Sequence, residues 1–209
     1  ELMLKFFGAE LESKETSVTI WPATELFGNR IDVPGDISSS VYFVAGGLIL
    51  PNSEVLIKNV GINPTRAGLI KVCEAMGADL TLLNENHGNA EPTADLLVRT
   101  SSLKACTIEG DIIPTLIDEL PTIAMMACFA EGTTVIRDAA ELKVKESNRI
   151  AIMVENLRAM GADVEETDDG MIIHGGKPLH GAVVDSHKDH RIAMTFAIAG
   201  LCAQGITHI

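Results

Sequence analysis

Apolar residues recur at helical spacing in several segments of the chain, and a short β-branched run follows each of these segments. The predicted helices cover residues 38–50, 65–76, 116–130, 146–160 and 189–203, with the end of another helix at residues 1–8. The predicted strands cover residues 17–21, 30–33, 54–60, 80–83, 96–100, 133–137, 164–167, 171–174 and 205–209. This alternation of helices and strands predicts an α/β protein.

The same junction between a helix and a strand occurs three times. Its copies are Phe7–Leu11, Met76–Leu80 and Met160–Val164, each with glycine followed by alanine, an acidic residue and an apolar residue. Glycine at this position favours a left-handed helix C-terminus. The chain is therefore read as units of about 75 to 80 residues, each of strand, helix, strand, helix, strand and strand. Units of this size predict large α/β repeats packed around one axis, not a solenoid.

Proline and glycine at Val33-Pro34-Gly35 mark the boundary between two such units. We expect residues 1–34 to be the end of one domain and residues 35–209 to be most of a second domain, truncated at its end. The chain opens at Glu1 in the middle of a helical pattern and stops within the predicted strand 205–209. We therefore expect it to be an internal piece of something longer.

The composition excludes several classes of protein. With 46% hydrophobic residues the chain has enough apolar side chains for a core, so disorder is excluded. Acidic residues number 29 against 16 basic ones, and the net charge of -13 argues against nucleic-acid binding and against a polybasic membrane contact. The four cysteines are far apart, which predicts neither zinc nor disulfides and favours a cytoplasmic location.

Basic residues are scarce, yet four of the sixteen lie between positions 137 and 149, and two of these are Lys145 and Arg149. The spacing predicts that Lys145 and Arg149 share one face at the start of a helix, with Glu146 three residues before Arg149. Cations at a helix N-terminus oppose the helix dipole, and a bound anion would resolve that conflict. An exposed helix with several ion pairs remains the structural alternative.

Two other helix starts carry polar residues. Asp118 begins the motif Asp-Glu-Leu-Pro, and Asp189 is followed by His190 and Arg191. Both aspartates suit helix caps, which is the structural alternative. Helix starts that follow strands converge on a ligand crevice in α/β sheets, so we expect Asp118, Lys145 and Asp189 to lie close together. His190 has no partner at metal-ligand spacing, and no metal site is predicted.

The segment Gly35–Ser40 begins with glycine and aspartate before three serines. It lacks the glycine spacing and the lysine of a P-loop, so we predict a helix-capping turn instead of a phosphate-binding loop. Tyr42 and Trp21 are predicted to be packing residues and not stacking platforms.

Several of these strings together resemble the EPSP synthase family, the 3-phosphoshikimate 1-carboxyvinyltransferases of the shikimate pathway. The resemblance rests on Leu142–Arg149 (LKVKESNR) and Asp189–Met194 (DHRIAM), with Val33–Ser39, Asp118–Pro121 and the Gly-Ala-acid junctions in the family's order. It covers essentially the whole chain, and five motifs in register are far more specific than any one of them.

The resemblance implies two globular domains, each of three βαβαββ units around a pseudo-threefold axis, that close on the substrates. It implies transfer of the enolpyruvyl group of phosphoenolpyruvate to the 5-hydroxyl of shikimate-3-phosphate, without a cofactor. By similarity, Asp118 is the base for that hydroxyl and Glu146 transfers a proton at the methylene carbon. Lys145 binds shikimate-3-phosphate, and Arg149 and Arg191 bind phosphoenolpyruvate. The intact enzyme is expected to be a monomer, and this piece alone is expected to be inactive.

The chain departs from the family at two places. The family often has Thr-Asp where this chain has Ser147-Asn148, and some members have asparagine in place of Glu141. Two alternatives stay open. One is the sister enolpyruvyl transferase acting on UDP-N-acetylglucosamine, which uses a loop cysteine that only Cys106 resembles. The other is a non-catalytic α/β module that binds an anion.

Overall fold

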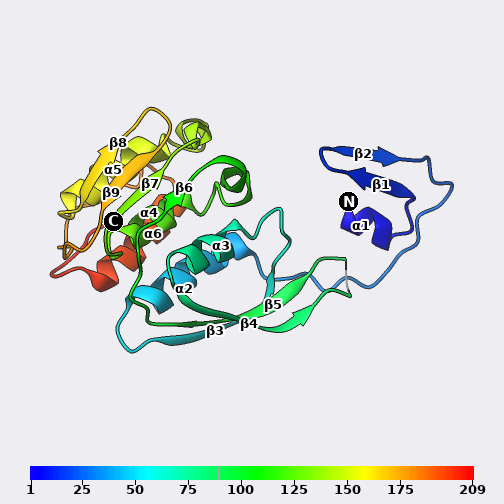
Figure 1. Ribbon diagram of the computed structural model, residues 1–209, viewed down its shortest axis with the longest axis horizontal. Helices are drawn as coiled ribbons and strands as arrows, with labels where there is room; N and C mark the ends of the chain where they lie inside the picture. The colour runs from blue at the N-terminus through cyan, green and yellow to red at the C-terminus, as the bar shows by residue number, and fades with distance from the viewer. Residues whose placement is uncertain (89) are drawn as a thin grey trace.

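The computed structural model describes residues 1–88 and 90–209 and shows a mixed architecture of helices and strands (Figure 1). The helices are α1 (Leu2–Phe6), α2 (Ile37–Ile49), α3 (Gly68–Ala75), α4 (Leu120–Ala127), α5 (Arg149–Ala159) and α6 (His190–Cys202), with short 3₁₀ helices η1 (Gly110–Thr115) and η2 (Ala140–Val144). The strands are β1 (Leu11–Lys14), β2 (Ser17–Ile20), β3 (Glu54–Gly61), β4 (Asp79–Asn86), β5 (Thr93–Arg99), β6 (Thr107–Ile108), β7 (Thr133–Ile136), β8 (Asp163–Glu166) and β9 (Met171–His174). The α/β prediction is confirmed.

The predicted repeat is present twice. The elements α2-β3-α3-β4-β5 and α4-β7-α5-β8-β9 follow the same order, and their sheets are β3-β5-β4 and β6-β7-β9-β8. Strand β6 pairs in parallel with β7, and a single parallel bridge from Gly35 to Val60 takes the equivalent place beside β3. A third unit begins with α6, where Val183 and His208 form another parallel bridge.

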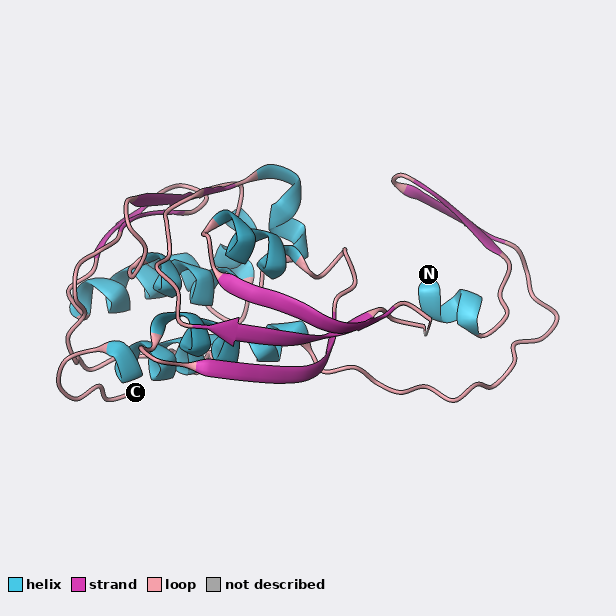
Figure 2. Cartoon of the chain, turned by 60° about the horizontal axis from the view of Figure 1, so that its bottom comes forward, coloured by secondary structure: helices cyan, strands magenta, loops and turns pink. Residues whose placement is uncertain are grey.

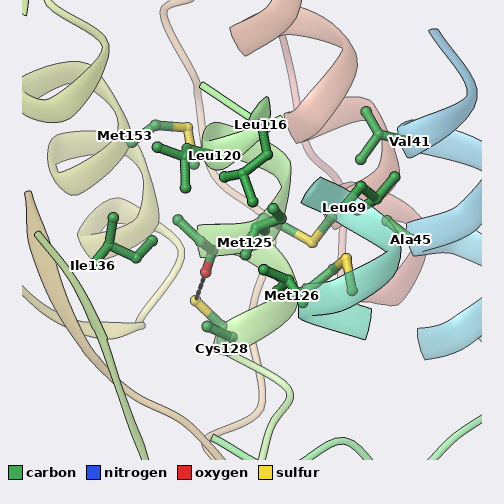
Figure 3. Close-up of a cluster of buried hydrophobic side chains, with 14 of the residues drawn as sticks. Val41, Ala45, Leu69, Leu116, Leu120, Met125, Met126, Cys128, Ile136 and Met153 are labelled. Carbon is green, nitrogen blue, oxygen red and sulfur yellow. Dashed lines mark hydrogen bonds between the residues drawn. The ribbon is translucent and has the colours of Figure 1, made fainter. Parts of the chain in front are cut away.

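The first helix of each unit lies in the centre of the molecule. Helices α2, α4 and α6 contact one another pairwise, and the two sheets lie on the outside (Figures 1 and 2). Every residue of α4 is buried, as expected for a helix that is apolar on all sides. Figure 3 shows Met125 and Met126 of α4 among side chains of the surrounding elements, including Val41 and Leu69. No helix among the described residues has the length and hydropathy that a membrane span requires.

The three repeated junctions have the backbone that the sequence predicts. Gly8, Gly77 and Gly161 follow the ends of α1, α3 and α5 with φ of 90°, 69° and 88°. At Gly161 a Cβ atom would also lie 2.9 Å from the ring of His180. Glycine is therefore required there both for the left-handed conformation and for close packing.

Helix α1 and the β1-β2 hairpin lie apart from the two larger sheets in both views (Figures 1 and 2). Large apolar side chains of this part are exposed, including Val18, Ile20, Trp21 and Phe27. Trp21 was predicted to pack, and its exposure of 43% contradicts that prediction.

Two predicted strands are wrong. Residues 30–33 form no strand, because they extend along the surface and pair with no neighbour in the described chain. Among the described residues, 205–209 make a single isolated bridge, between Val183 and His208, and not a ladder. The apolar and β-branched residues of both segments predicted strands from local pattern alone, whereas a strand also needs a partner.

Helix α5 starts three residues later than predicted. Asn148 caps it by accepting a hydrogen bond from the backbone N–H of Ala151, so Lys145 and Glu146 precede the helix. Lys145 has extended backbone, with φ of −75° and ψ of −155°, at the end of η2. The prediction that Lys145 and Arg149 share one helical face is therefore wrong, although the structure still brings the two close to one carboxylate.

Candidate active site

The N-terminal turns of α2, α4 and α6 meet at one place. Asp36 caps α2 by accepting from the backbone N–H groups of Ser38 and Ser39, which confirms the capping turn that the sequence predicts. Ser38 donates a hydrogen bond to Glu119 just before α4, and Arg191 of α6 contacts Asp118. Three helix starts, each with a positive dipole end, therefore surround one small region of the molecule.

The carboxylate of Asp118 is held by three cations. Its Oδ1 lies 3.2 Å from Nη1 of Arg149 and 3.9 Å from Nζ of Lys145, while its Oδ2 lies 3.3 Å from Nη2 of Arg191. The Asp118 side chain is 22% exposed, so one edge of this cluster remains open to solvent. The same cations also pair with Glu141, Glu146 and Asp189, so a bound anion would have to displace carboxylates from them.

Arg149 is the best-held member of this cluster. Its side chain is fully buried, and its Nε donates to Oδ2 of Asp189 at 2.9 Å while its other nitrogens reach Asp118 and Glu146. Burial lowers the pKa of Arg149, but the hydrogen bond that Arg149 donates to Asp189 and the charges of three carboxylates outweigh burial and raise this pKa. Arg149 is therefore a fixed cation and not the exposed ion-pair residue of the structural alternative.

Asp189 links two of these helices. It caps α6 by accepting from the backbone N–H of Arg191 at 2.9 Å, and it also accepts from Arg149 and from the hydroxyl of Ser147. Burial raises the pKa of Asp189, yet the hydrogen bonds from Arg149 and Ser147 lower it below its ordinary value. The aspartate therefore stays charged, and it fixes the position of Arg149 relative to Arg191.

The structure brings together all five residues predicted from the sequence: Asp118, Lys145, Glu146, Arg149 and Arg191. The capping alternative for Asp118 is contradicted, because Glu119 occupies the N-cap position of α4 and Asp118 caps no helix among the described residues. His190 is exposed, and the described chain contains no cluster of three potential metal ligands.

The sequence analysis missed Glu119. Its side chain is buried, and its carboxyl accepts a hydrogen bond from Ser38, whose hydroxyl in turn accepts from Nη2 of Arg66 at 2.8 Å. Burial raises the pKa of Glu119 above its ordinary value, although the Ser38 hydrogen bond and Arg66 oppose that rise. In the sequence, only its position next to Asp118 could have indicated a role for Glu119, because its hydrogen-bond partner Ser38 lies far away along the chain.

A pH-dependent stability follows from Glu119. An acid whose pKa is raised by folding stabilises the protein at low pH, and this contribution is lost as the pH rises through the raised pKa. Glu119→Gln keeps the shape but cannot ionise. We therefore expect the free energy of unfolding of the variant, relative to the wild type, to increase as the pH rises from about 4 to 7. Urea unfolding at several pH values measures this difference, and a difference that falls with rising pH would contradict it.

A model of the EPSP synthase family (3-phosphoshikimate 1-carboxyvinyltransferase) matches residues 1–209 of the chain. The chain belongs to the EPSP synthase family. The 3-phosphoshikimate 1-carboxyvinyltransferase of Thermoanaerobacter sp. is 54% identical over 209 residues, which are 100% of this chain and 49% of that protein. The one from Gloeothece citriformis is 55% identical over 211 residues and is covered to 47%.

Solved structures of EPSP synthases have the same fold. The EPSP synthase of Acinetobacter baumannii superposes with a TM-score of 0.93 at 43% identity, covering 98% of this chain and 48% of that one. The enolpyruvyl transferase NikO of Streptomyces tendae has a TM-score of 0.70 at 21% identity and shares the fold alone. The chain spans about half the length of the curated relatives that it matches.

Proposed function

We propose that the complete protein containing this chain transfers the enolpyruvyl group of phosphoenolpyruvate to the 5-hydroxyl of shikimate-3-phosphate and releases phosphate. The observation that carries this proposal is the carboxylate of Asp118 held among Lys145, Arg149 and Arg191. Both substrates are anions, and the reaction requires a base between groups that bind them. Membership of the EPSP synthase family supports the choice of acceptor.

In the first step of the proposed reaction, Asp118 is the general base. As the 5-hydroxyl oxygen attacks C2 of phosphoenolpyruvate, its proton passes to Asp118, and the C3 methylene gains a proton to become a methyl group. Glu146 is the proposed group at C3, since it lies beside Arg149 and its side chain is 53% exposed. Glu146 then takes a proton back from C3 as phosphate leaves C2, which regenerates the double bond in the product.

Substrate binding changes the partners of Asp118. Without ligand its carboxylate is paired with three cations, and these contacts occupy the oxygens that would accept the hydroxyl proton. We assign Lys145 to shikimate-3-phosphate and Arg149 and Arg191 to phosphoenolpyruvate. The two substrate anions then replace Asp118 on these cations, which leaves its carboxylate free to accept the hydroxyl proton.

The remaining part of the site belongs to the rest of the complete protein in this proposal. We assign residues 1–34 to the end of the N-terminal domain and residues 35–209 to most of the C-terminal domain. The separate position of α1 and the β1-β2 hairpin supports this division. The proposal places the protein in the cytoplasm as a monomer, and the four cysteines of this chain are free thiols.

The sister reaction on UDP-N-acetylglucosamine has little support. Cys106 was the one cysteine predicted to resemble the loop cysteine of that enzyme, yet Cys106 is half-buried and burial raises the pKa of its thiol. A thiol with a raised pKa is a poor nucleophile at neutral pH.

A phosphate-release assay on the complete protein tests the proposal. Phosphoenolpyruvate is supplied with shikimate-3-phosphate or with UDP-N-acetylglucosamine in separate reactions. We expect release only with shikimate-3-phosphate. Release with the nucleotide sugar alone would establish the sister reaction, and phosphoenolpyruvate binding without release under either condition would establish an anion-binding module.

Arg191→Ala tests the assignment of that residue. A group that binds substrate equally in the ground and transition states changes KM more than kcat. Loss of a charge-assisted hydrogen bond corresponds to about 1.5–3 kcal/mol, so we expect KM for phosphoenolpyruvate to rise at least tenfold. Steady-state kinetics at saturating shikimate-3-phosphate measures this, and an unchanged KM would exclude Arg191 from the binding site.

A further inference from the structure

Tyr42 lies on the central helix that faces the candidate site. It is in the second turn of α2, four residues after Ser38, so both side chains lie on the same face of the helix. Ser38 on that face bonds Glu119, and α2 packs against α4 and α6. Tyr42 was predicted to be a packing residue, and its burial agrees with that prediction, since the side chain is only 5% exposed.

The hydroxyl of Tyr42 does more than fill space. It is buried, and no group in residues 1–88 or 90–209 forms a hydrogen bond with it. Burial raises the pKa of this phenol, while Arg191 lowers it both by its charge and as a hydrogen-bond donor within reach. No contact between the two groups has the geometry of a hydrogen bond in the described chain, so Arg191 is near the Tyr42 oxygen but not aligned with it. A buried polar group without a partner costs free energy, so its presence beside two substrate-binding arginines requires an explanation.

Arg191 has N–H donors that lack an acceptor among the described residues. A guanidinium group carries five N–H donors, whereas the one hydrogen bond that the Arg191 guanidinium makes within the described chain is from Nη2 to Oδ2 of Asp118 at 3.3 Å. That distance is long for a hydrogen bond. A donor group with free N–H positions therefore lies beside a phenol oxygen that lacks a donor.

We propose that Tyr42 is a positioning residue for Arg191, a role that rests on the proposed function. When the substrate anions replace Asp118, the Arg191 guanidinium turns from the aspartate. It then donates one N–H to the Tyr42 oxygen and the others to the carboxylate of phosphoenolpyruvate. The unsatisfied hydroxyl of the free site is satisfied only in the bound state, which makes Arg191 better oriented for the anion.

Tyr42→Phe in the complete protein tests this role. We expect its KM and calorimetric dissociation constant for phosphoenolpyruvate to rise about tenfold, the value for one hydrogen bond to a charged group. The kcat and the KM for shikimate-3-phosphate stay unchanged. The Tm does not fall, because the substitution removes a hydroxyl that has no partner in the free protein.

Thr134→Val is the matched control. Thr134 on β7 also has a fully buried hydroxyl with no partner in the described part of the chain, and it is not among the site residues. We expect the Tm of Thr134→Val to change as that of Tyr42→Phe does, without any change in phosphoenolpyruvate affinity.

In an Arg191→Ala background, Tyr42→Phe is expected to have no further effect on phosphoenolpyruvate affinity, because the two residues act through one interaction.

The outcomes separate this inference from the proposed function. A wild-type protein that binds phosphoenolpyruvate, together with a Tyr42→Phe variant that binds it equally well, overturns the role of Tyr42 alone. A variant with a lower Tm and equal losses in kcat and affinity also overturns it, since that result describes a structural residue. A wild-type protein that does not bind phosphoenolpyruvate overturns both.

Discussion

Asp118→Asn is expected to lower kcat of the complete protein by a factor on the order of 100 to 10,000. The amide has the size of the carboxylate but cannot accept the hydroxyl proton. Its effect on phosphoenolpyruvate binding is expected to be much smaller, because Lys145, Arg149 and Arg191 remain in place. Steady-state kinetics with both substrates gives kcat and both KM values in one experiment.

Asp111→Asn is the control for this substitution, since Asp111 is an exposed carboxylate on η1 in the same part of the chain. It is expected to keep the wild-type kcat. If Asp118→Asn keeps a near-normal kcat, then Asp118 only holds the three cations together. If both its kcat and its Tm collapse, the defect lies in folding.

Arg149→Met is expected to destabilise the chain by about 3–5 kcal/mol, the cost of breaking a buried ion pair by removing one partner. The reason is Asp189, which is fully buried and loses its strongest hydrogen bond. Urea unfolding measures the change. Because Asp189 also caps α6, we expect the loss to extend beyond one contact.

Arg158→Met provides the comparison within the same helix. Arg158 is exposed, and its Nε bonds the carbonyl of Val164 at 2.9 Å, so we expect a cost of about 1 kcal/mol. The double variant Arg149→Met/Asp189→Asn removes both charges and is expected to recover part of the lost stability. Equal costs at Arg149 and Arg158 would show that the buried pair contributes no more than a surface contact.

The sequence predicted those features that depend on local chemistry. Glycine after three helices predicted the left-handed turns at Gly8, Gly77 and Gly161, and aspartate before serine predicted the cap at Asp36. The repeat followed from the order of these elements. Each of these features needs only a few neighbouring residues, which is why one sequence was sufficient.

Features that depend on distant partners were not predicted. The start of α5 was placed too early, at Glu146, because glutamate is a good helix former, whereas Asn148 makes the cap. The hydrogen bond of Ser38 with Glu119 joins residues 81 positions apart, which no local pattern reveals. Residues 30–33 have a strand pattern, but pairing is decided by the tertiary structure.

The position of Asp118 relative to bound substrates tests the account most directly. It is measured in a crystal structure of the complete protein with shikimate-3-phosphate and phosphoenolpyruvate, or with a non-reacting analogue of the latter. We predict that Asp118 leaves its cations and lies within hydrogen-bond distance of the 5-hydroxyl, while Arg149 and Arg191 contact the phosphoenolpyruvate anion. Substrates bound elsewhere, with Asp118 still bridging Lys145, Arg149 and Arg191, would contradict the proposed site.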